Sequence, residues 1–141
     1  MCTEEILHEY CERLAEGNWG DIWVVKPEIL RNLCPQATSV EELIDEMAEN
    51  KIDDFTAVVD HLSDNGEHKS HKFRDESDGF KAIALKGEQK QYYRYPAFRI
   101  KNNWVVVYGF IKPRKKLWAE KNIDWANTVR TKITSEIKKT Q

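Results

Sequence analysis

Residues 80–111 contain three apolar runs, which read Phe80-Lys-Ala-Ile-Ala-Leu85, Tyr92-Tyr-Arg-Tyr-Pro-Ala-Phe-Arg-Ile100 and Trp104-Val-Val-Val-Tyr-Gly-Phe-Ile111. In the first two runs, apolar and polar residues alternate roughly with the two-residue period of a strand. The third run is nearly all apolar, as in a central strand buried on both faces. Polar turns at Gly87–Gln91 and Lys101–Asn103 separate them. We therefore expect an antiparallel sheet of three or four strands. Pro96 should lie at an edge or a bulge, because proline has no N–H to donate.

Helical patterns flank this sheet in the sequence. Apolar residues recur at helical spacing over residues 3–16, 39–47, 53–62 and 117–138. The second pattern begins at a capping box, Ser39-Val-Glu-Glu42, and the third ends at Asp64-Asn65-Gly66. Three shorter elements are expected: a strand at Asp21–Val25, a helical turn at Pro27–Leu33 and an edge strand at His71–Arg74. The expected fold class is α+β, with N-terminal helices, the sheet, and a C-terminal helix.

Length and composition narrow the class of protein. A chain of 141 residues fits one domain better than two. The odd set of cysteines, Cys2, Cys11 and Cys34, has no CxxC pair, which favours reduced thiols over disulfides or zinc. No apolar run reaches the roughly 18 residues of a membrane span, and the acidic N-terminus lacks the basic start of a signal peptide. We therefore expect a cytoplasmic protein with no membrane contact.

The net charge of −2 hides a large asymmetry. Residues 1–65 contain four basic and 16 acidic residues, a net charge of −12, whereas residues 66–141 contain 18 basic and eight acidic residues, a net charge of +10. The basic half should attract polyanions such as RNA. The acidic half restrains that binding by folding over or beside the basic face, or it docks a partner. If it restrains binding, deletion of residues 1–50 should tighten the binding of RNA. Alternatively, the two halves neutralise each other across the fold.

The order of motifs between Asp54 and Ile133 resembles the RelE/ParE toxin superfamily, and most closely its HigB-like branch. The similarity lies in a helix ending at Leu62-Ser-Asp-Asn-Gly66, followed by basic residues and three strands. The strands carry the motifs Asp78-Gly-Phe-Lys-Ala-Ile-Ala-Leu85, Tyr93-Arg-Tyr-Pro-Ala-Phe-Arg-Ile100 and Trp104-Val-Val-Val-Tyr-Gly-Phe-Ile-Lys112. Residues 1–50 lie outside it, although Ile22–Val25 can hold the family's first strand. The resemblance divides the chain into an acidic, mostly helical extension at 1–50, packed on the core, and a toxin domain at 51–141.

What the resemblance implies is a toxin of a type II toxin–antitoxin pair. Such a protein engages mRNA at the ribosome and cleaves it by attack of the 2′-hydroxyl, without a metal or another cofactor. Its further partner is an antitoxin, expected to be a helix-turn-helix protein. Two alternatives stay open: a non-catalytic module of toxin-like fold that binds RNA, DNA or an acidic protein, and a ParE-like inhibitor of a topoisomerase.

The candidate site is cationic, because cations stabilise the dianionic state that develops during RNA cleavage. The candidate catalytic residues are Arg94, Arg99, Lys112, Arg114 and Lys115. The candidate RNA-binding residues are Lys72, Arg74, Lys81, Lys86, Tyr93, Tyr95, Lys116 and Lys121. Tyrosines beside arginines can stack on bases, although strand alternation turns about half of such side chains into the core.

Three further features bear on catalysis. His61, His68 and His71 cluster in the sequence, and His71 is a candidate acid or base. No metal site is expected there, because the turn between these histidines holds no rigid ligand geometry. The strand at Phe80–Leu85 departs from the family, since alternate positions that are often charged are Ala82 and Ala84 here.

Overall fold

A computed structural model describes residues 2–87, 91–113 and 118–140. The helices are α1 (Thr3–Tyr10), α2 (Pro27–Leu33), α3 (Val40–Asp45), α4 (Glu49–Asn65) and α5 (Glu120–Lys138), with a short 3₁₀ turn, η1, at Ser77–Gly79. The strands are β1 (Cys11–Glu16), β2 (Asp21–Val25), β3 (Phe73–Asp75), β4 (Lys81–Lys86), β5 (Gln91–Ile100), β6 (Asn103–Val106) and β7 (Phe110–Pro113).

The described strands form one seven-stranded sheet in the order β1-β2-β6-β5-β4-β3, with β7 paired to β5 beyond the end of β6. Only the β2–β6 pair is parallel, and the other pairs are antiparallel. The α+β class is therefore confirmed, but the expected three or four antiparallel strands are too few. The reason is that the first half of the chain adds β1 and β2 to the sheet, and that the third apolar run splits into β6 and β7.

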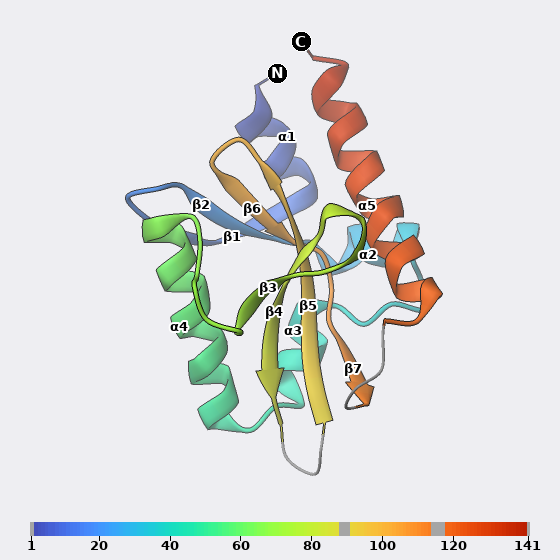
Figure 1. The fold of residues 1–141 in the computed structure, drawn as a ribbon. Helices are drawn as coiled ribbons and strands as arrows, with labels where there is room; N and C mark the ends of the chain where they lie inside the picture. Colours follow the sequence, from blue (N-terminus) through green and yellow to red (C-terminus); the bar gives the residue numbers. More distant parts are fainter. Residues whose placement is uncertain (1, 88–90, 114–117, 141) are drawn as a thin grey trace.

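Helices cover both faces of this sheet (Figure 1). On one face, α1, α2 and α5 pack over a buried cluster that includes Trp23, Phe98 and Val105. On the other face, α3 and α4 pack over a second cluster that includes Ile22, Tyr95 and Val106. The central strands β5 and β6 are thus buried on both sides, as their apolar sequences require.

The third apolar run does not form one continuous strand. The chain leaves the ladder at Val107–Gly109, and β5 changes partner there: residues 97–100 pair with β6 and residues 91–94 pair with β7. Pro96 lies at this change, where its carbonyl accepts a hydrogen bond from Val107 N–H at 2.8 Å. Because proline has no N–H, the strand facing Pro96 cannot complete a regular ladder. The expected irregularity at Pro96 is therefore present, although β5 itself is central.

The expected helix over residues 3–16 ends early. Helix α1 stops at Tyr10, and residues 11–16 form β1, which pairs with β2 through a hairpin closed by the Gly17 N–H to Gly20 carbonyl bond. The helical spacing of Cys11 and Leu14 was misleading: Cys11 is buried, whereas Leu14 is 41% exposed beside an irregularity in the β1–β2 register. Pairing with β2 outweighs local helical propensity in this segment.

Several local predictions are confirmed. The strand Asp21–Val25 and the helical turn Pro27–Leu33 have the predicted bounds. Ser39 caps α3, accepting a hydrogen bond from Glu42 N–H at 3.1 Å. Helix α4 begins earlier than predicted but stops before Gly66, which has a left-handed φ of 77°. The last helix starts at Glu120 instead of residue 117 and buries Ala126, Val129, Ile133 and Ile137.

Strands β1 and β2, which lie within residues 1–50, belong to the same sheet as the later strands, since β2 pairs in parallel with β6. The expected boundary at residue 50 therefore does not separate two sheets. Within the described ranges, none of the helices combines the length and hydropathy that crossing a bilayer requires.

Burial in the β1–β2 hairpin predicts a sharp contrast between two aliphatic residues. Ile22 is fully buried, so Ile22→Ala should destabilise the fold by about 2–5 kcal/mol through lost burial and a cavity. Leu14→Ala, which removes an exposed side chain, should change stability by no more than about 0.5 kcal/mol. Urea denaturation of both variants measures this difference, and equal losses would contradict the placement of β2 inside the sheet.

Candidate cationic site

The register of the sheet gathers cations on one face. Arg94 of β5 lies opposite Ala84 of β4, and two residues away Tyr92 lies opposite both Lys86 and Lys112. Residues directly opposite one another, and residues two apart on one strand, point to the same face. This face is the reverse of the one that packs under α3 and α4.

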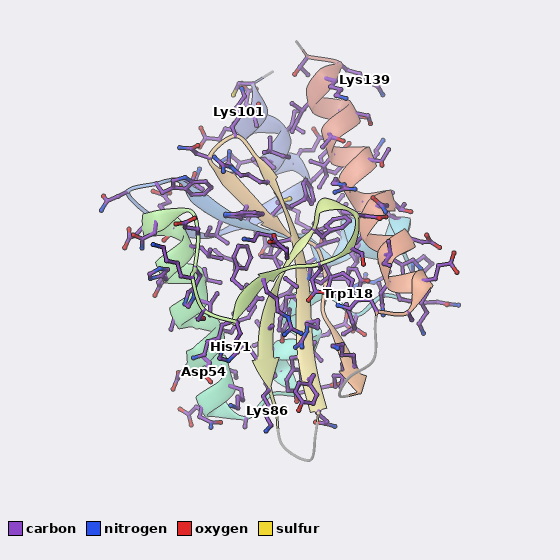
Figure 2. The ribbon with its side chains drawn as sticks, in the orientation of Figure 1. Asp54, His71, Lys86, Lys101, Trp118 and Lys139 are labelled. Atoms are coloured by element: carbon purple, nitrogen blue, oxygen red, sulfur yellow. The ribbon has the colours of Figure 1, made fainter. Side chains whose placement is uncertain are left out.

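A hollow of about 360 Å³ opens at this end of the sheet, and we call it the cationic hollow. The described residues that line it are Lys51, Asp54, His71, Lys72, Arg74, Ala84, Leu85, Lys86, Tyr92 and Arg94. Five of these ten are cations and one is a carboxylate, so the hollow attracts anions. Figure 2 shows Asp54, His71 and Lys86 near the first turns of α4 and the end of β4.

Arg94 is the most buried of these cations, with 4% of its surface exposed. Its Nη1 donates to the Tyr93 carbonyl oxygen at 2.9 Å, and its guanidinium carbon lies 5.8 Å from the centre of the Tyr92 ring. Among the described residues, no acceptor is bonded to the buried Nε. A buried donor without an acceptor costs about 1–3 kcal/mol, which an anionic ligand would offset.

The neighbouring charges act on one another. Burial and, next, the positive charge of Arg74 lower the pKa of the Arg94 guanidinium to about 10, so it stays protonated at neutral pH. Burial, then Arg94 and Arg74, lower the pKa of Lys112. The carboxylate of Glu76 opposes both shifts and accepts a hydrogen bond from Arg74 Nε at 3.1 Å. Arg74, Arg94 and Lys112 therefore form one electrostatic group.

Two titratable side chains face these cations from outside the sheet. Asp54 comes from α4, where it pairs with Lys51 at 3.6 Å, and His71 comes from the segment before β3. The other two histidines lie apart from the hollow: the rings of His61 and His68 are 4.6 Å apart, and both residues line a separate depression. Burial, followed by repulsion from His61, lowers the pKa of His68. Within the described ranges, no cluster of His, Cys, Asp and Glu has the composition of a metal site.

The hollow unites five of the predicted site residues. Lys72, Arg74, Lys86 and Arg94 line it, and Lys112 lies beside Arg94. The fold brings them together because β5 pairs with both β4 and β7, and β3 pairs with β4 so that Arg74 lies opposite Ala82. Arg114, Lys115 and Lys116 lie outside the described residues.

Three predicted cations lie elsewhere. Arg99 is five residues from Arg94 and so points to the opposite face, where its Nε donates to the Lys101 carbonyl and its guanidinium lies 5.0 Å from the Trp19 ring centre. Lys81 pairs with Asp75 at 3.6 Å. Lys121 lies over Trp125 on α5, 5.6 Å from the ring centre.

The two tyrosines predicted to contact RNA are core residues. Tyr93 and Tyr95 are 6% and 0% exposed, under α3 and α4, and the Tyr95 hydroxyl donates to Met47 Sδ at 2.7 Å. The prediction for these two is wrong because strand alternation turns them away from Arg94. Tyr92, of the opposite parity, is the tyrosine that lines the hollow.

Sequence reasoning missed Lys51 and Asp54 as site residues. Both lie on the polar side of α4, away from its buried Phe55 and Val58, and nothing in the sequence indicates that this side borders β4. The idea that residues 1–50 fold over or beside the basic face stays a prediction, although every described residue that lines the hollow lies between 51 and 94. Deletion of residues 1–50 would remove β1 and β2 and could not test that idea.

Comparison with known proteins gave no match to any protein-family model, curated protein or solved structure.

The position of Arg94 predicts a conflict between stability and ligand binding. Arg94→Met removes a buried charge and an unsatisfied donor while keeping the aliphatic volume, so the free energy of unfolding should stay within about 1 kcal/mol or rise. Urea denaturation without ligand measures it. A loss of more than about 2 kcal/mol in the free energy of unfolding would show instead that the fold requires Arg94.

Proposed function

We propose that this protein is a toxin-type endoribonuclease that holds RNA phosphates in the cationic hollow and cuts the chain by metal-independent attack of a 2′-hydroxyl. The observation that carries the proposal is Arg94, a buried cation whose Nε has no acceptor in the described part of the chain. Phosphate oxygens supply both the negative charge and the acceptors that this side chain lacks.

The hollow contains the types of group that such cleavage requires. The 2′-oxygen must lose a proton, the 5′-oxygen must gain one as it leaves, and charge builds on the phosphorane between them. His71 and Asp54 line the hollow and can move protons, while Arg94 and Lys112 can stabilise the negative charge. The step needs no redox change and no metal ion.

RNA is favoured as the polyanion by the position of Tyr92. Its ring lies beside Arg94 in the hollow, so a base can stack on it while the adjacent phosphate contacts the guanidinium. The resemblance to RelE/HigB-like toxins adds support. Residues 22–25, the segment expected to form the first strand of such a toxin, lie in β2 of the same sheet. The proposal includes the expected cytoplasmic setting, mRNA on the ribosome and an antitoxin partner.

A second candidate is a non-catalytic RNA-binding module. Ala82 and Ala84 favour it, because they occupy strand positions beside Arg74 and Arg94 where the resemblance leads us to expect charged groups. In that case the hollow binds phosphate but lacks part of the catalytic set.

Cleavage separates the two candidates. Purified protein added to a translation reaction should produce new 5′ ends within mRNA, detected by primer extension. A 2′-deoxy nucleotide at the cut site should stop cleavage there, because the nucleophile is gone. Arg94→Met should lower the cleavage rate by about 100-fold.

The matched control is Arg99→Ala, which removes one positive charge from the opposite face and should leave cleavage unchanged. Binding without new 5′ ends would support the module instead. Cleavage that persists in Arg94→Met would place the active site elsewhere.

Salt dependence tests whether the hollow carries the electrostatic part of RNA binding. Each phosphate contact to single-stranded RNA adds about −0.7 to the slope of log K against log salt. The double variant Arg74→Ala/Lys86→Ala should therefore weaken binding and make the slope shallower by about 1.4. Lys101→Ala/Lys139→Ala is the charge-matched control, since both residues lie far from the hollow in Figure 2. Equal slopes for the two double variants would rule the hollow out as the RNA contact.

A further inference from the structure

The charges of the cationic hollow are only partly balanced by the residues around it. Lys51 pairs with Asp54 at 3.6 Å, and Arg74 pairs with Glu76 at 3.1 Å. Within the described part of the chain, Lys72, Lys86 and Arg94 form no ion pair with a carboxylate. The hollow thus suits a ligand group that carries more than one negative charge.

The depth of Arg94 favours one kind of phosphate over another. An internal phosphodiester can contact this side chain, which is only 4% exposed, but it brings a nucleoside on each side into the hollow. A terminal phosphate has one ester bond and three free oxygens, so it can enter first with the rest of the chain behind it. The volume of about 360 Å³ is that of a small-ligand pocket and does not suit a duplex.

The small side chain of Ala84 makes room for such a group. Ala84 lies directly opposite Arg94 in the β4–β5 register and lines the hollow. A longer side chain at this position would project into the space beside the guanidinium. The alanine that departs from the toxin pattern therefore creates a recess next to the deepest cation.

From this geometry we propose that the hollow binds the terminal phosphate monoester of an RNA chain, with Arg94 at its base and Lys72 and Lys86 at its sides. The inference rests on the proposed function and adds that the same hollow binds a phosphorylated RNA end more tightly than an internal phosphodiester. At neutral pH a phosphate monoester carries a charge of about −1.5 to −2, against one negative charge for an internal diester. The monoester therefore matches both the excess charge and the depth of the hollow.

The test compares one RNA heptamer in three forms: with hydroxyls at both ends, with a 5′-phosphate, and with a 3′-phosphate. The heptamer is 2′-O-methylated throughout, so that cleavage cannot occur, and binding is measured by fluorescence anisotropy. One phosphorylated form should bind about tenfold more tightly than the form with two hydroxyl ends, and which one it is identifies the preferred end. Equal affinities for the three forms would overturn the inference.

Two variants locate the effect. Ala84→Leu fills the recess without removing a cation, so it should abolish the preference for the phosphorylated end. Lys86→Ala, at an exposed residue that folding does not need, should reduce the preference in part. Arg99→Ala is the control on the other face and should keep the full preference.

Failure of this inference is distinguishable from failure of the proposed function. If all three RNAs bind equally and mRNA is still cut, the function stands and the end preference is wrong. If no RNA binds, the protein is titrated with adenosine 5′-monophosphate, and the Arg94 Nε–H signal is followed by NMR to show whether the phosphate monoester binds. A shift of that signal would keep the monoester site without an RNA function, and no shift would remove both.

Discussion

The arrangement of the cationic hollow depends on a proline in the middle of the longest strand. Pro96 has no N–H, and β5 changes partner from β6 to β7 beside it. The chain leaves the sheet at Val107–Gly109, where Tyr108 turns into the core and donates to the Asn122 carbonyl at 2.6 Å. It then rejoins the sheet as β7, which sets Lys112 opposite Tyr92. Without that break, a regular β6 would continue along β5 with a different register.

Strand alternation decides which side chains are available at the hollow. Along β5, Tyr93 and Tyr95 belong to the face under α3 and α4, whereas Tyr92 and Arg94 belong to the other. On the side of β5 that carries Arg94, the end near Tyr92 faces the hollow, while Phe98 packs in the core under α1, α2 and α5. Stability and function therefore use neighbouring residues of a single strand. Arg94 combines the two conditions, since it faces the hollow and is still almost fully buried.

The asymmetry of charge along the sequence is only partly an asymmetry in space. The hollow draws its cations from the basic half, but Lys51 and Asp54 come from α4, within the acidic half. None of the described residues among 1–50 lines the hollow, and β1 and β2 extend the sheet through the β2–β6 pair. The first half of the chain therefore contributes structure to the site more than electrostatic control.

The sequence by itself determined the local elements whose causes are local: the cap at Ser39, the stop at Gly66, the strand at Asp21–Val25 and the pool of cations in the second half. Only the tertiary structure decided that residues 11–16 form a strand, that β2 joins β6, and which cations meet. The physical reason is that capping and periodicity act over a few residues. Strand pairing and the approach of α4 to β4, in contrast, depend on contacts between segments far apart in the chain.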